Sequence, residues 1–147
     1  MSHDSGANPL RWDCSRQGCF NLHKRPKIEL FADCLPGRLA FSDVDAIAEV
    51  NGNLLALEWK EHRRIPTGQR VLFERWTAGG PATVLLVVGD ARDMTVDELA
   101  CVHGGVISAW RDADLDSLRR DIRVWADWAL AHPAALRHVG MANEVTA

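Results

Sequence analysis

The sequence predicts an α/β fold: a single-domain α/β/α sandwich around a mixed central sheet. Helical and strand-like patterns alternate along the 147-residue chain, which is the order that builds such layers. Residues 82–88, ATVLLVV, form a continuous run typical of a strand buried on both faces. Asn51-Gly52 lies between two apolar runs and is the strongest short-range signal for a hairpin.

The domain is expected to span residues 11–147, because a chain of this length builds one core. That core would cover residues 27–110, with a C-terminal helix over residues 114–131. Residues 1–10 are polar and contain Gly and Pro, a composition typical of disorder. The sequence has no apolar run of about 18 residues and no basic-then-apolar leader, so we expect a cytoplasmic protein without a membrane span.

The elements before and within the hairpin follow from apolar spacing. A helix is expected over residues 27–35, where apolar residues recur at helical spacing before Pro36-Gly37 ends the pattern. Residues 39–41 would open a strand. The hairpin itself would occupy residues 43–60.

Two helices are expected after the hairpin. Thr67 would cap a helix that runs to about Ala78 and ends at Gly79-Gly80. Beyond the buried strand, Thr95 and Glu98 have the spacing of a capping box, which predicts a short helix.

The C-terminal part is predicted to contain a strand and a long helix. Residues 106–110 would form the last strand. Asp114 would cap a helix that ends near Ala131, before His132-Pro133. One face of this helix carries an apolar stripe made of Leu115, Leu118, Ile122, Trp125 and Ala129.

The hairpin carries charges where a buried strand normally carries none. A two-residue turn at Asn51-Gly52 places Asp45 across from Glu58 and Asp43 across from Lys60. Since side chains alternate along a strand, these four would project from one face. Directly opposed Cβ atoms lie roughly 4.5–5.5 Å apart, so two carboxylates could share one cation. The other face would be apolar, with Val44, Ala46, Ala48, Leu55, Leu57 and Trp59.

This charged face has two interpretations. A divalent cation would resolve the repulsion between the carboxylates, and Mg²⁺ prefers such ligands together with waters and phosphate oxygens. A bound metal lowers the pKa of its water and stabilises charge on a phosphate, while a lysine beside it orients the nucleophile. The alternative is a solvated polar face, with Asp43 and Lys60 as a surface salt bridge.

Asp45 followed by Glu58-Trp59-Lys60 resembles the Asp…(Asp/Glu)-x-Lys signature of the restriction-endonuclease-like nuclease superfamily, also written PD-(D/E)xK. The hairpin location and Gln69 at the start of the next helix resemble its virus-type replication-repair nuclease and Holliday-junction resolvase branches. The resemblance covers residues 27–90. It implies a restriction-endonuclease-like fold and hydrolysis of duplex or branched DNA that depends on Mg²⁺, for which Mn²⁺ could substitute.

The resemblance also implies a role for each matching residue. Asp45 and Glu58 would bind the metal, and Lys60 would position or activate the attacking water. Gln69 would contact a phosphate or support the ligands, with a solvent-facing residue as the alternative. Glu29, on an upstream helix, would be an accessory metal or water ligand, with a local ion pair as the alternative.

Either aspartate of the hairpin could be the metal ligand. The signature often has a proline before its aspartate, but here Val44 precedes Asp45 and Ser42 precedes Asp43. Asp45 is favoured because it is expected to pair with Glu58, and Asp43 is the alternative.

Charge limits how the chain would contact DNA. The net charge of -3 argues against binding nucleic acid by bulk charge. Two local basic runs could still touch the DNA backbone without sequence selectivity, or simply face water. The candidates in them are Lys24, Arg25, His62, Arg63 and Arg64. Cutting both strands at one place needs two active sites, which favours a homodimer.

The four cysteines offer a second metal hypothesis. A structural Zn²⁺ could be held by Cys14, Cys19, His23 and Cys34, although their spacing fits no common zinc pattern. Reduced thiols are the favoured alternative in a reducing compartment.

The nuclease hypothesis also has an alternative from another functional class. A non-catalytic module of nuclease-like fold would bind nucleic acid or a protein through the basic runs. Its carboxylates would then be structural or vestigial.

Overall fold

The computed structural model of the chain describes residues 28–135. The chain divides into two compact units, Met1–Phe41 and Ser42–Ala147. In the first unit a short 3-10 helix, η1, spans Ile28–Phe31.

Two expectations for the first unit are wrong. The α-helix predicted over residues 27–35 is only the turn of η1, and residues 39–41 form no strand. Pro36-Gly37 follows so closely that the apolar pattern is too short to sustain an α-helix without tertiary support.

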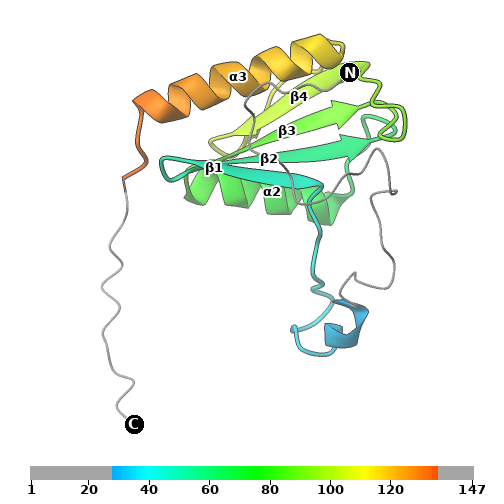
Figure 1. The fold of residues 1–147 in the computed structure, drawn as a ribbon. Helices are drawn as coiled ribbons and strands as arrows, with labels where there is room; N and C mark the ends of the chain where they lie inside the picture. Colours follow the sequence, from blue (N-terminus) through cyan, green and yellow to red (C-terminus); the bar gives the residue numbers. More distant parts are fainter. Residues whose placement is uncertain (1–27, 136–147) are drawn as a thin grey trace. The chain divides into compact units, whose positions relative to one another are not determined.

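The second unit is a six-stranded mixed sheet with one helix over each face (Figure 1). Its strands are β1 (Ala46–Val50), β2 (Asn53–Lys60), β3 (Ala82–Val88), β4 (Glu98–His103), β5 (Val106–Ile107) and β6 (Arg111–Asp112). Its helices are α2 (Thr67–Gly79) and α3 (Leu115–Ala131). The strand order is β1-β2-β3-β4-β5, with β6 also paired to β4. Only the β2–β3 pair is parallel among these described strands. The predicted α/β class and mixed sheet are confirmed.

The sheet has a hydrophobic core on each face. The α3-side core contains Leu55, Leu85, Val87, Val96, Leu99 and Leu118. The α2-side core contains Ala56, Phe73, Val84, Leu86, Ala100 and Val102. Successive residues of β3 point into alternate cores and all seven are buried, as predicted for this run.

The hairpin forms at the predicted turn but its ladder is shorter than expected. Asn51 and Gly52 have φ angles of 55° and 83°, the left-handed conformation that a tight hairpin turn requires. The register is the predicted one, but the ladder stops at Ala46 opposite Leu57. The expected cross-strand pairs of Asp45 with Glu58 and Asp43 with Lys60 are therefore not part of it.

The prediction that Val44 shares a face of the hairpin with Leu57 and Trp59 is also wrong. Val44 packs against the α2-side core, whereas Leu57 and Trp59 pack against the α3-side core. The reason is that regular strand alternation ends before Ala46, so residues upstream do not follow the pleat.

The long helices have nearly the predicted bounds. Thr67 is the first residue of α2 rather than its cap, because Pro66 occupies the N-cap position without a side-chain hydrogen bond. Asp114 caps α3 as predicted and accepts the Ser117 backbone N–H at 2.7 Å. The hydrogen bonds from the Ser117 side chain and backbone lower the pKa of the Asp114 carboxyl. Neither these helices nor any other described helix is long and apolar enough to cross a membrane.

The helix predicted from Thr95 and Glu98 is wrong. Glu98 begins β4, which pairs antiparallel with β3 along its whole length. This pairing outweighs a local signal that fits either conformation. The predicted strand at residues 106–110 is shortened to β5, and β6 follows it.

Gly89 is the position where the chain leaves β3, and it allows the close return of the loop. A Cβ atom at Gly89 would overlap the backbone carbonyl of Thr95. We therefore expect Gly89→Ala to lower the free energy of unfolding by about 1–3 kcal/mol in urea denaturation. Gly68→Ala is the control, because nothing lies within 4 Å of its new Cβ and it should be neutral or stabilising. Equal stability of the two variants would contradict the described path of the loop.

Candidate functional site

Three residues of the predicted motif meet beneath α2. Glu58 projects from β2 toward α2 and its relative exposure is only 6%. Its Oε1 atom accepts hydrogen bonds from Lys60 Nζ at 2.8 Å and from Gln69 Nε2 at 2.6 Å. Gln69 therefore faces the carboxylate and not solvent.

The chain order explains why these residues meet. Glu58 and Lys60 are two positions apart on β2, so both face the α2 side. The chain then enters α2, crosses the sheet and returns as β3, parallel to β2. A short connection after Lys60 starts the helix next to the end of β2, and Gln69 is the third residue of that helix.

Two oxygen atoms of this cluster lack a hydrogen-bond partner among the described residues. They are Glu58 Oε2 and Gln69 Oε1, and both are buried. An unsatisfied buried acceptor is costly, and two acceptors without a donor suit a cation or an ordered water. Mg²⁺ prefers hard oxygen ligands of this kind. The cluster therefore fits a divalent metal in its ligand chemistry.

Asp45 lies beside the motif but contacts its backbone. Its Oδ2 atom accepts the Trp59 backbone N–H at 2.6 Å. In a longer hairpin, that N–H would pair with a carbonyl of β1, so the carboxylate replaces the missing strand. Asp45 and Asp43 are both exposed. No group of three or more His, Cys, Asp or Glu side chains in the described part of the chain is arranged to hold a metal.

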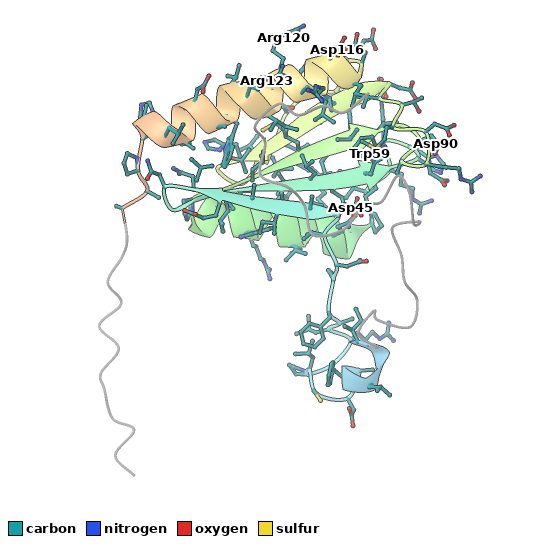
Figure 2. All side chains as sticks on the ribbon, in the orientation of Figure 1. Asp45, Trp59, Asp90, Asp116, Arg120 and Arg123 are labelled. Carbon is teal, nitrogen blue, oxygen red and sulfur yellow. The ribbon has the colours of Figure 1, made fainter. Side chains whose placement is uncertain are left out.

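A polar hollow lies at the ends of β2 and β3, and we call it the motif hollow. Its lining includes Asp45, Trp59, Lys60, Asp90, Arg92, Thr95 and Asp97. Figure 2 shows Trp59 and Asp90 at this end of the sheet. The carboxyl ends of parallel strands are where α/β sheets commonly bind ligands. The hollow gives Lys60 and Asp45 access to a ligand.

The residues after β3 were not identified from the sequence as part of this hollow. Asp90, Arg92, Thr95 and Asp97 come from the loop between β3 and β4 and its approach to β4. The available signal was Gly89-Asp90 at the end of a buried strand. This signal indicates a ligand site only if β3 is known to run parallel to β2, and that pairing is a long-range contact.

The predicted nucleic-acid contacts are only partly described. Arg63 donates from Nε to Glu98 Oε2 at 2.7 Å and makes a second hydrogen bond to the same carboxylate. This pair raises the pKa of Arg63 and lowers that of Glu98. Arg63 thus already has a carboxylate partner within the protein, although it is exposed like His62 and Arg64. Lys24 and Arg25 lie outside the described residues.

The remaining predicted ligands are not brought together in the described structure. Glu29 belongs to η1 in the first unit, and its role stays a prediction. Cys34 is exposed and its Sγ lies 3.7 Å from Asp33 Oδ1. The other proposed zinc ligands, Cys14, Cys19 and His23, lie outside the described residues.

The hydrogen bond from Gln69 should be measurable as stability. Gln69→Leu removes one of two donors to a buried carboxylate, so we expect the free energy of unfolding to fall by about 1–3 kcal/mol. Urea denaturation without metal would measure this change. Arg75→Leu, an exposed change on the same helix, is the control. If both variants lose the same small amount, Gln69 does not support Glu58.

Comparison of the chain with protein-family models, with curated proteins and with solved structures finds no match. The functional interpretation therefore depends on the motif and on the contacts described above.

Proposed function

We propose that the protein is a Mg²⁺-dependent nuclease of the restriction-endonuclease-like superfamily that hydrolyses DNA phosphodiester bonds. The observation that carries the proposal is the cluster of Glu58, Lys60 and Gln69 beneath α2. In this cluster, buried Glu58 Oε2 has no hydrogen-bond partner among the described residues, and Lys60 Nζ lies 2.8 Å from Glu58 Oε1. Mn²⁺ is expected to substitute for Mg²⁺.

The proposed roles follow from which atoms are already occupied. Glu58 Oε2 would hold the metal, because Oε1 is taken by Lys60 and Gln69. The bound metal would lower the pKa of a water and offset charge on the phosphate. Lys60 lines the motif hollow and would orient that water or the phosphate. Gln69 would keep the carboxylate in place and offer Oε1 to the water.

Asp45 would supply the second ligand. Its Oδ2 atom accepts the Trp59 backbone N–H, which would leave the other carboxylate oxygen to bind the metal. Asp45 would thus bind the metal and hold the end of β2 in place at the same time. Asp43 remains the alternative ligand.

The architecture around the motif supports the proposal. The signature lies on a hairpin, and the next helix brings Gln69 back to it. The following strand runs parallel to the motif strand. These features agree with the expectations from the resemblance, although the assignment to the superfamily remains part of the proposal.

A second candidate function is a non-catalytic module that binds nucleic acid or a protein. Two observations favour it. Among the described residues, no three potential ligands converge, and Lys60 is already paired with Glu58. In that case Glu58 would serve stability alone.

Cleavage assays separate the two functions. Labelled linear duplex, branched and single-stranded DNA would be incubated with the full chain in Mg²⁺, in Mn²⁺ and in chelator. We expect metal-dependent cleavage that falls at least about 100-fold in Lys60→Ala, which removes the group that orients the water or the phosphate, and in Glu58→Gln, which removes the charged metal ligand. Arg75→Ala is the matched surface control and should keep wild-type activity.

Circular dichroism would establish that every variant is folded. Undiminished cleavage in both motif variants would rule out the assignment of the site. A folded wild-type protein that cleaves none of these substrates in either metal would favour the binding module.

A further inference from the structure

The outer edge of β1 is the open edge of the sheet among the described residues (Figure 1). At the opposite edge, the outer side of β4 is occupied by β5 and β6, which have two residues each. Such short edge strands offer little backbone to a further strand. By contrast, β1 is five residues long, pairs with β2 without a bulge, and contains no proline or lysine. It therefore lacks the features that usually prevent a sheet edge from pairing with another strand.

Ile47 and Glu49 direct their backbone hydrogen-bonding groups outward from this edge. In a hairpin with a two-residue turn, the residues next to the turn form a hydrogen-bonded pair, and hydrogen-bonded and non-hydrogen-bonded pairs then alternate. Val50, Ala48 and Ala46 are thus the residues that bond to β2. The N–H and C=O groups of Ile47 and Glu49 point outward, and no hydrogen bond in the described part of the chain reaches them. Ile47 is also 54% exposed.

Charge selects one pairing of this edge with a second copy of itself. An antiparallel pair centred on Ala48 places Ile47 opposite the partner's Glu49. A shift of two residues would place either Glu49 or Asp45 opposite the partner's Glu49, and like charges directly opposite one another are destabilising. A shift of one residue would not align the outward-facing groups of the two strands. The centred register therefore satisfies both edges without repulsion.

We propose that the protein forms a dimer in which β1 pairs with β1 of a second copy, in the antiparallel register centred on Ala48. Ile47 and the partner's Glu49 would exchange both of their backbone hydrogen bonds, and two-fold symmetry repeats the exchange. The small side chain of Ala48 lies on the axis, where the two strands approach most closely. A strand of this length buries less surface than a permanent interface, so the dimer is reversible and depends on protein concentration.

This dimer would place both proposed metal sites on one face of a continuous sheet. The two-fold axis runs perpendicular to the sheet, so the α2 sides of the two copies coincide. Glu58 lies one residue beyond Leu57, which is the partner of Ala46 at the end of the ladder. With the usual rise per residue and strand spacing, the two Glu58 residues would be roughly 25 Å apart. Cleavage of both strands of one duplex requires two sites on the same face, and this consequence alone rests on the proposed function.

The oligomeric state tests the edge. Sedimentation velocity of the full chain over a series of concentrations would follow the monomer–dimer equilibrium. Ile47→Glu places a like charge opposite the partner's Glu49 in both symmetric pairs, so we expect at least about tenfold weaker association. Ile47→Lys is the matched control, because it places an opposite charge there and should keep or strengthen the association. Both variants change the same exposed side chain, and circular dichroism would establish that they are folded.

A cysteine cross-link tests the register in a second way. Ala48→Cys places two sulfur atoms across the two-fold axis at a non-hydrogen-bonded pair, where Cα atoms lie about 4.5 Å apart, within the range of a disulfide. Oxidation should give a covalent dimer, and mass spectrometry should find the disulfide between the two substituted positions. Ala46→Cys is the control, because residue 46 would face the partner's Val50 and should not join to its own copy.

A wild-type protein that stays monomeric at every concentration would overturn the dimer and leave the edge to a strand of another protein. A dimer that the two Ile47 variants affect equally, or one that forms no disulfide with Ala48→Cys, would overturn this register. DNA cleavage, measured separately, keeps failure of the dimer distinct from failure of the proposed function. A monomer that cleaves DNA would retain the nuclease and remove the dimer, whereas a dimer of this register that cleaves nothing would retain the interface and remove the nuclease.

Discussion

The buried carboxylate of Glu58 connects the sheet to α2 through the hydrogen bond that Gln69 donates, and Lys60 donates a second one from the same strand. A carboxylate with 6% exposure is expensive to bury unless donors surround it. Here one donor comes from the same strand and the other from the first turn of the following helix. The bond from Gln69 holds the start of α2 against the end of β2. Since both donors use Oε1, they also leave Oε2 for a ligand, so the same contacts that stabilise the fold shape the proposed metal site.

The end of the hairpin depends on a second carboxylate. Asp45 stops the β1–β2 ladder by accepting the Trp59 backbone N–H with its side chain. The ladder therefore stops before Trp59, the residue that follows Glu58. The motif hollow, which Asp45 and Trp59 help to line, lies at this end of the ladder. On the other side of the sheet, Trp59 packs against the core that anchors α3. The central residue of the motif therefore links the proposed active site to the packing of α3.

Local sequence signals predicted the parts of this fold that local physics determines. Asn51-Gly52 set the hairpin register because that turn requires left-handed backbone angles. Asp114 and the apolar stripe located α3, and the run after Pro81 located β3. The failures occurred where long-range contacts decide. Thr95 and Glu98 fit a helix until β3 supplies a strand partner, and Asp45 is not paired with Glu58 because its side chain takes the place of a ladder bond. The burial of Glu58 by α2 depends on the crossover, which alternation along one strand cannot show.

The proposed site depends on Glu58 Oε2 being a metal ligand rather than an unsatisfied structural acceptor. Calorimetric titration of Mn²⁺ into the metal-free protein, compared with Glu58→Gln, decides between the two. Gln keeps the side-chain shape but replaces a charged ligand with a neutral one. We expect a Mn²⁺ site in the wild-type protein that is lost or at least about tenfold weaker in Glu58→Gln. Equal Mn²⁺ affinity in two folded proteins, or no binding by either, would contradict the assignment of Glu58 as a ligand.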